Sequence, residues 1–165
     1  MKKHGKSNPA GGWKWRLAPV TGVVIGVGGL VAVHAAHPRP NYRPPPGALN
    51  AFVNQNNIDQ TICRPGWTAT IRPDVSYTNG LKQVQMARRH LGGKAGDYEE
   101  DHFIPLSSGG APADVANLWP QRIADARVKD QAELKVHDAI GARVITLAEA
   151  QKRWRTDWRH AGDEL

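Results

Sequence analysis

The chain has 165 residues, a formal net charge of +7 and a single cysteine, Cys63. This length allows one domain with a hydrophobic core plus an extension, and one cysteine excludes an intramolecular disulfide and a cysteine-based zinc site. Seven of the 22 basic residues and none of the 15 acidic residues fall within residues 1–45, so the rest of the chain carries equal numbers of each. The high isoelectric point is therefore poor evidence that the globular part binds nucleic acid.

The N-terminal part is organised like an export or anchor sequence. Residues 1–16 form a basic tail, and residues 17–36 are apolar and contain no Lys, Arg, Asp or Glu. Basic residues before an apolar segment keep the N-terminus in the cytoplasm and send the following chain across the membrane. A buried helix of a soluble protein is disfavoured because the segment holds four glycines, at positions 22, 26, 28 and 29. We expect either a transmembrane anchor with an extracytoplasmic domain or a signal segment that is cleaved for secretion.

A proline-rich linker, residues 37–49, separates this segment from the predicted domain at residues 50–165. β-Branched and aromatic residues predict short strands or an extended arm within Asn50–Asp74. A helix follows, with a predicted cap at residues 77–79, an inward stripe and an end at Gly92-Gly93. The stripe consists of Leu81, Val84 and Leu91.

The remaining sequence predicts a β-ribbon followed by two helices. Residues 98–104 and 115–119 are the expected strands, joined by a Ser- and Gly-rich loop. Residues 122–140 predict a helix, and residues 146–149 form a capping box that opens another helix to about Trp158. The predicted inward positions are Ala124, Val128, Ala132 and Val136 on the first helix, and Leu147, Ala150, Trp154 and Trp158 on the second. The expected fold class is therefore α+β.

The stretch YEEDHFIPLSSGGAPADVANLWPQ, residues 98–121, carries the candidate chemistry. A neutral histidine such as His102 can take a proton from water at physiological pH, and a carboxylate such as Asp101 can bind a divalent cation. Neighbouring side chains on a regular strand point to opposite faces, so this pair converges on one substrate only if the ribbon is twisted or bulged there.

The pattern DHxIPxxxGG followed by NLW resembles the HNH (His-Me finger) endonucleases. The flanking segments ICRPGWT, IRPDVSYTNGLK, ARVKDQAELKVHDAI and ITLAEAQ resemble small exported bacterial members, from about Asn54 to Trp158. The resemblance implies a ββα-metal core with flanking helices. It also implies His102 as the general base, Asp101 as a metal ligand and Asn117 as the residue that holds the loop and the histidine in place.

The third signature position departs from that family. The chain reads Asp125-Ala126-Arg127 where a His or Asn is expected. Asp125 is a candidate metal ligand, although a carboxylate in a first helical turn is also favoured by the helix dipole. Lys129 and Arg127 are candidate nucleic-acid contacts, and Lys129, Asp130 and Glu133 match the KD…E run of the small members.

Two further expectations concern individual pairs. Glu133 and His137 stand one helical turn apart and are candidates to pair with each other. The resemblance implies a second cysteine near position 141, where this chain has Gly141, so Cys63 is expected to lack its partner.

Together these features predict a metal-dependent endonuclease that hydrolyses DNA, or RNA, with little sequence specificity. The expected cofactor is Mg²⁺ or Mn²⁺, the expected partners are nucleic acid and a membrane, and no protein partner is evident. The alternative is a catalytically compromised HNH-fold module that binds nucleic acid or a cell-envelope component. The missing third ligand and the neutral domain favour this second class.

Overall fold

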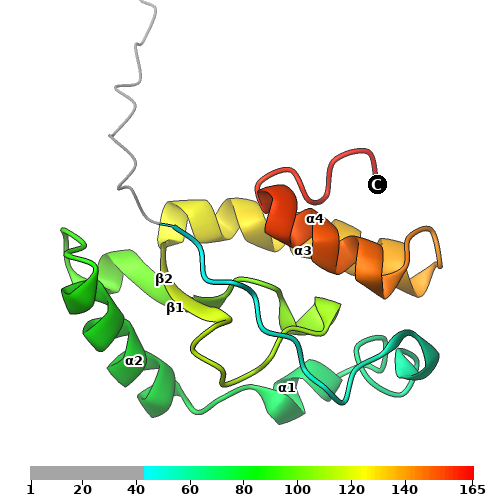
Figure 1. The fold of residues 1–165 in the computed structure, drawn as a ribbon, viewed down its shortest axis with the longest axis horizontal. Helices are drawn as coiled ribbons and strands as arrows, with labels where there is room; N and C mark the ends of the chain where they lie inside the picture. Colours follow the sequence, from blue (N-terminus) through cyan, green and yellow to red (C-terminus); the bar gives the residue numbers. More distant parts are fainter. Residues whose placement is uncertain (1–42) are drawn as a thin grey trace, which may run out of the picture. The chain divides into compact units, whose positions relative to one another are not determined.

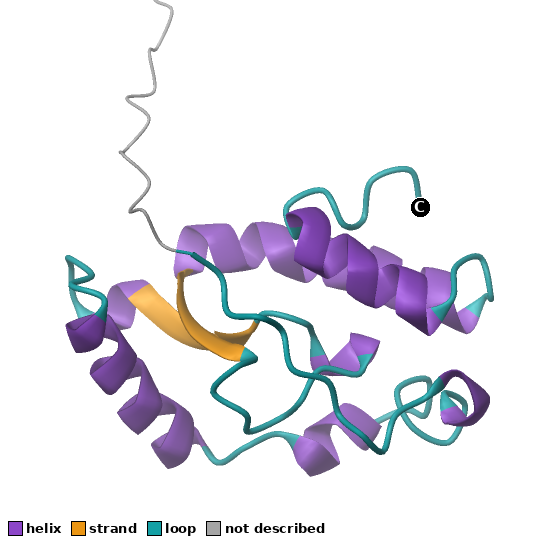
Figure 2. Cartoon of the chain, in the orientation of Figure 1, coloured by secondary structure: helices purple, strands orange, loops and turns teal. Residues whose placement is uncertain are grey.

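A computed structural model describes residues 43–165, which form an α+β domain (Figures 1 and 2). The elements are the 3-10 helix η1 (Gln55–Asn57), α1 (Trp67–Ile71), α2 (Val75–Arg88), η2 (Ala95–Asp97), β1 (Tyr98–His102), η3 (Leu106–Ser108), β2 (Leu118–Arg122), α3 (Ile123–Gly141) and α4 (Leu147–Asp157). The predicted tail, the apolar segment and most of the linker lie outside the described residues. Within residues 43–165, no helix has the length and apolar character needed to cross a membrane.

The two strands form an antiparallel ribbon in regular register, from Tyr98 opposite Arg122 to His102 opposite Leu118. Helix α2 lies along one side of this ribbon, and α3 runs on directly from β2 and packs beside α4 (Figure 1). The end of the predicted linker belongs to the domain. The backbone N–H of Gly47 donates to the Ala116 carbonyl at 2.8 Å, and Leu49 pairs with Gly110.

The hydrophobic core lies between the ribbon and the helices α3 and α4. Trp119 meets Phe103 and Trp158 edge-on, with ring centroids 5.8 and 5.9 Å apart. The other buried members of this core include Ile58, Ile62, Ile104, Val136, Ile140, Leu147, Ala150 and Trp154. Burial of this apolar surface is the main force that fixes α3 and α4 on the ribbon.

The prediction of short strands within Asn50–Asp74 was wrong. This part of the chain contains η1, a series of turns and α1, which follows Gly66 in a left-handed conformation (φ 80°). β-Branched and aromatic residues favour strands mainly through packing on neighbouring strands. The described part of the chain offers no strand to this segment, because its sheet consists of β1 and β2 alone.

Helix α2 begins earlier than predicted, because the Asp74 side chain caps it by accepting a hydrogen bond from the N–H of Ser76 at 2.7 Å. Its buried residues are Gln85 and Met86, while Val84, a predicted inward residue, is 48% exposed. Apolar periodicity assigns the wrong face here because a polar residue meets the ribbon: Gln85 Nε2 donates a hydrogen bond to the Leu118 carbonyl at 3.0 Å.

The second strand also lies later than predicted. Residues 114–117 form a turn in which the Asp114 side chain accepts a hydrogen bond from the Ala116 N–H at 2.8 Å, and Val115 is 57% exposed. The strand therefore begins at Leu118 and includes Pro120, which is tolerated because β2 has a free edge.

Helix α4 is confirmed. Thr146 caps it by accepting a hydrogen bond from the Glu149 N–H at 3.1 Å, and the four predicted inward residues are buried. Helix α3 is confirmed in extent, but Val128 is 52% exposed and Ala124 is also exposed. The buried stripe instead consists of Ala126, Lys129, Ala132, Val136, Ala139 and Ile140.

Candidate active site

His102 ends β1 and is held by the loop that follows it. Its side chain is 5% exposed, and Nε2 lies 2.8 Å from the Pro112 carbonyl oxygen. A carbonyl oxygen only accepts hydrogen bonds, so Nε2 carries the proton and donates it, which leaves the lone pair of the neutral ring on Nδ1. Burial lowers the pKa of His102 below its usual value, although the Pro112 carbonyl and Asp101 oppose the shift. The neutral, proton-accepting form is therefore favoured near pH 7.

Asn117 is fully buried and fastens both ends of the loop between the strands. Its Oδ1 accepts a hydrogen bond from the Ile104 N–H at 2.8 Å, and its Nδ2 donates to the carbonyls of Ile104 and Ala111, both at 2.9 Å. Ala111 directly precedes Pro112, which holds His102. The side chain does not line the cavity described below, so Asn117 is a positioning residue for the loop and the histidine.

Gly110 makes this close loop closure possible. A Cβ atom at this position would lie 1.9 Å from the Ile104 carbonyl oxygen and 2.6 Å from Asn117 Nδ2. No side chain can be accommodated there without displacing the backbone. The second glycine of the sequence pattern therefore has a specific structural role.

Asp101 and His102 both line a cavity of about 330 Å³ at the end of β1. The ribbon has no bulge there; the two side chains meet the same cavity because the strand ends at His102. The cavity is strongly acidic, since three more carboxylates, from Glu99 on β1 and from Asp130 and Glu133 on α3, line it together with Arg72. Its other lining residues are Thr68, Pro105, Leu106 and Ser107.

Lys129 brings a buried positive charge to this acidic group. Its side chain has no exposed surface, and Nζ lies 2.9 Å from Asp101 Oδ2 and 2.5 Å from Glu133 Oε1. Burial acts to lower the pKa of Lys129, but these two carboxylates outweigh it and raise the pKa above its usual value, so the side chain remains charged. The proposed contact of Lys129 with a nucleic-acid phosphate is inconsistent with this burial.

The predicted pairing of Glu133 with His137 is likewise replaced, because Glu133 binds Lys129 and His137 Nε2 lies 3.0 Å from the Ile62 carbonyl oxygen.

The carboxylates of the cavity crowd one another. Burial raises the pKa of Glu99, and the nearby charges of Asp101 and Asp130 raise it further. Burial also raises the pKa of Glu133. Among residues 43–165, four carboxylates line the cavity, against one cationic lining residue, Arg72, and the buried Lys129, so the cavity would attract a further cation.

Asp125 does not join this cavity. It lies in the first turn of α3, lines a different cavity and stands 3.7 Å from Arg159. The structure therefore separates Asp125 from Asp101 and His102, and its prediction as a third ligand is not supported. Asp125 shares a face of α3 with Lys129 and Glu133, but it lies one turn nearer the start of the helix, beside Arg122, and therefore meets a different cavity. Arg127 is exposed on α3 and stays a candidate contact.

The donor set suits a hard, hydrated cation better than an ion enclosed by protein ligands. Among residues 43–165, no three His, Cys, Asp or Glu side chains stand close enough to hold a metal ion together. Mg²⁺ commonly binds through one or two carboxylates and keeps several waters. The acidic cavity fits that mode, with Asp101, Glu99 and Asp130 as the available oxygen donors.

The contribution of Glu99 was missed by the sequence analysis. Its signal is the period of two along β1, which places Glu99 on the same face as Asp101. Lys129 was assigned to the wrong surface, although it is in phase with Ala132 and Val136 on the buried stripe of α3.

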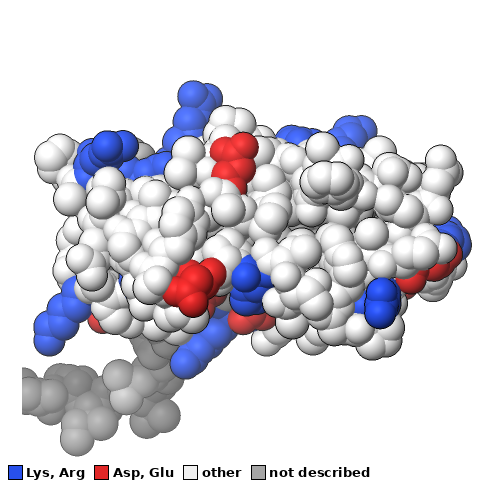
Figure 3. Space-filling view, turned by 90° about the horizontal axis from the view of Figure 1, so that it is seen from below, with Lys and Arg blue, Asp and Glu red and all other residues white. Residues whose placement is uncertain are grey.

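The exposed charges are mixed in sign. On the face shown in Figure 3, basic and acidic side chains are interspersed, and no continuous basic band is visible.

Comparison of the chain with protein families, with curated proteins and with solved structures finds no match.

Proposed function

We propose that this protein is a metal-dependent endonuclease of the HNH type that hydrolyses phosphodiester bonds in DNA or RNA with little sequence specificity. The observation that carries the proposal is that His102 lines the same acidic cavity as Asp101. Its Nε2 is engaged by the Pro112 carbonyl oxygen, which leaves Nδ1 to accept a proton. The order of ribbon, clamped loop and following helix supports assigning β1, β2 and α3 to a ββα-metal core.

The chemistry follows from the side chains of the cavity. His102 accepts a proton from water, whose oxygen forms a bond to phosphorus as the bond to the departing oxygen breaks. Asp101, with Glu99 or Asp130, would hold Mg²⁺ or Mn²⁺, and such an ion would supply positive charge to the phosphate and to the departing oxygen. Arg72 lines the cavity and is positioned to pair with a phosphate oxygen. Asn117 keeps the loop, and with it the Pro112 carbonyl, in place.

Nicking of a supercoiled plasmid by the full-length protein tests this function. We expect nicking with Mg²⁺ or Mn²⁺, none in EDTA, and a loss of at least about 100-fold in Asp101→Asn. Asp138→Asn is the matched control, because it removes the same charge at an exposed position of α3 outside the cavity and should change cleavage far less. Equal losses in both variants would reject Asp101 as the specific ligand, and no nicking with any divalent cation would reject the proposal.

A non-catalytic module that binds nucleic acid or a cell-envelope component is the second candidate. Two observations favour it: Asp101 already forms an ion pair with Lys129, and the described residues contain no cluster of three metal-binding side chains. This candidate predicts binding of nucleic acid without cleavage. For either function we propose export, with residues 17–36 as a membrane anchor or a cleaved signal.

A further inference from the structure

A second cavity, of about 90 Å³, lies at the start of α3, beside the strand end occupied by Tyr98 and Arg122. Its lining includes Gln121, Arg122, Asp125 and Arg159, with the rings of Tyr98, Trp119 and Trp158. The site is smaller than the engineered cavity of about 150 Å³ that takes up benzene, so it suits a compact group rather than a nucleobase.

Gln121 gives this cavity unmet hydrogen-bonding capacity. Its side chain is 2% exposed, and within the described part of the chain neither its amide nitrogen nor its amide oxygen has a hydrogen-bond partner. A buried amide without partners costs free energy, so a ligand or water that satisfies it is favoured.

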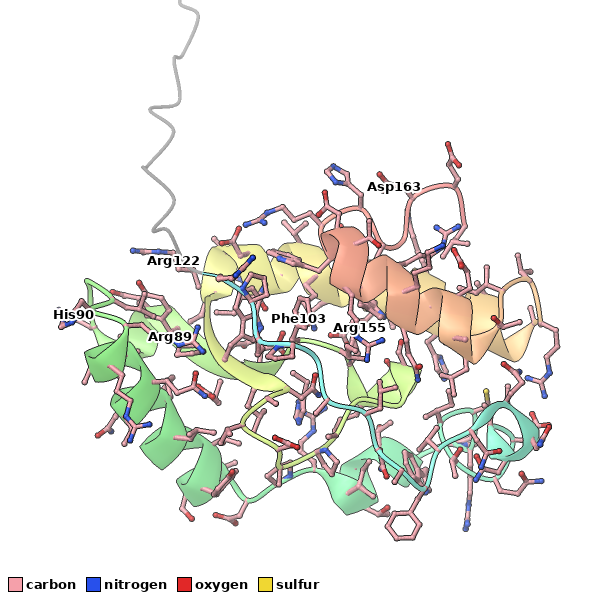
Figure 4. All side chains as sticks on the ribbon, viewed as in Figure 1. Arg89, His90, Phe103, Arg122, Arg155 and Asp163 are labelled. Carbon is pink, nitrogen blue, oxygen red and sulfur yellow. The ribbon has the colours of Figure 1, made fainter. Side chains whose placement is uncertain are left out.

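The two arginines and the start of α3 favour a negatively charged ligand. No side chain caps α3, so the N–H groups of its first turn are available to an anion. Arg122 and Arg159 each lie over an aromatic ring, 5.0 Å from the Tyr98 centroid and 4.1 Å from the Trp158 centroid. Figure 4 shows Arg122 at the start of α3. Stacked guanidinium groups are restrained, which lowers the cost of ordering them around an oxyanion.

We propose that this cavity binds a phosphate group through Gln121, Arg122, Arg159 and the N-terminus of α3. Asp125 is the group that opposes binding, because its carboxylate lies in the same cavity and already pairs with Arg159 at 3.7 Å. A bound phosphate competes with Asp125 for Arg159. The site is therefore expected to be weak for free phosphate and stronger for a phosphate delivered by a longer ligand.

A backbone phosphate of the nucleic-acid substrate is the source that we favour, and this part rests on the proposed function. The cavity begins at the Tyr98 end of β1, four residues from His102, which corresponds to roughly 13 Å along a strand. A single strand that reaches the acidic cavity could thus place another phosphate here and be held without base contacts.

The test measures binding in EDTA, where no cleavage occurs. Inorganic phosphate is titrated by intrinsic tryptophan fluorescence, since Trp119 and Trp158 line the cavity, and a labelled 12-nucleotide single strand is titrated by anisotropy. We expect Arg159→Ala and Arg122→Ala each to weaken both ligands about tenfold. For the oligonucleotide, the slope of log Kd against log salt should fall by about 0.7. Asp125→Asn should strengthen the binding of inorganic phosphate and of the oligonucleotide several-fold.

Lys135→Ala and Asp138→Asn are the matched controls. Both residues are exposed on α3, so these substitutions remove a positive and a negative charge outside the cavity. Gln121→Leu, which retains size but removes the amide, should weaken phosphate binding with folding intact by circular dichroism. If Gln121→Leu does not fold, Arg122→Ala, at an exposed position, tests the phosphate site instead.

Equal effects of the cavity variants and the control variants on binding would overturn the proposed phosphate site. If the cavity variants weaken binding of inorganic phosphate but not of the oligonucleotide, the proposal that the bound phosphate belongs to the nucleic acid would be overturned. Binding as predicted without nicking under any metal would reject the nuclease and leave the phosphate site standing.

Discussion

Lys129 Nζ lies 2.9 Å from Asp101 Oδ2, inside the protein and between two carboxylates of the candidate active site. This ion pair joins the middle of α3 to the strand that carries His102. It both orients Asp101 and supplies part of the positive charge that a metal ion would otherwise provide. Its removal therefore affects stability and metal binding in separable ways.

Lys129→Met should destabilise the fold by about 3–5 kcal/mol, because Asp101 and Glu133 lose their buried countercharge. It should also increase the affinity of those carboxylates for a divalent cation. Thermal unfolding with and without 10 mM Mg²⁺ measures both effects, since a ligand that binds only the folded state raises Tm. We expect a larger Mg²⁺-induced rise in Tm for the variant than for wild type. An equal or smaller rise would show that Lys129 and the metal do not compete.

Asn117→Ala removes three hydrogen bonds that close the loop before Pro112. The buried backbone groups left unsatisfied should cost about 2–4 kcal/mol of unfolding free energy. The loosened hold on His102 should reduce kcat about 10–100-fold. Urea unfolding and plasmid nicking measure the two effects, with the exposed Asn79→Ala on α2 as the control. Nicking that survives in folded Asn117→Ala would argue against this positioning role.

Glu100 makes the stability of the fold depend on pH. Burial raises its pKa to about 8, even though Arg89 and Lys82 oppose the shift. The folded protein therefore binds this proton more tightly than the unfolded chain, whose glutamates titrate near 4.5. The stabilisation is fully present below about pH 4.5 and is lost as the pH rises through about 8.

Because Glu100 is only partly buried, solvent screening limits this loss to about 1–2 kcal/mol. Glu100→Gln keeps the shape of the side chain and should flatten the decline in unfolding free energy between pH 5 and about 8. Urea titrations across that range provide the measurement. A wild-type decline that persists unchanged in the variant would assign the pH dependence to other groups.

Gly141→Cys should form a disulfide with Cys63. An ideal Cβ atom at position 141 would lie 3.9 Å from Cys63 Sγ, so a displacement of about 1 Å brings the pair to bonding geometry. The bridge closes a long loop and should add about 2–4 kcal/mol under oxidising conditions. Thiol titration and thermal unfolding with and without reductant report the bond. Two free thiols in the oxidised, folded variant would contradict this geometry.

The sequence was most informative where local signals and packing agree. The capping residue Thr146 and the inward residues of α4 were predictable, because the amphipathic pattern there begins directly after a residue that caps the helix. The extent of α3 was also predictable, but its buried face was not, because Ala124 and Val128 are exposed, and β2 begins three residues later than predicted. Residues 67–71 were not predictable as a helix, since their β-branched composition favours strands when a neighbouring strand exists.

The candidate site was predictable only in part. Asp101 and His102 do line one cavity, and Asn117 does tie the loop. The burial of Lys129 was not anticipated, because lysine is almost never fully buried unless it is paired. Its partners, Asp101 and Glu133, come from different elements, so only the three-dimensional arrangement reveals the cluster and excludes Asp125 from it.

The most direct test of the central claim is plasmid nicking by full-length wild type, His102→Ala and His90→Asn at saturating Mg²⁺ across pH 5 to 9. His90 is exposed with φ 50°, a conformation that asparagine adopts readily, so its variant is a matched control. We predict that His102→Ala loses about 100–10,000-fold in rate while His90→Asn retains it. The wild-type rate should rise with pH through a pKa below 6.5, because burial lowers the pKa of His102. Equal rates for all three proteins, with His102→Ala folded, would contradict the role of His102 as the general base.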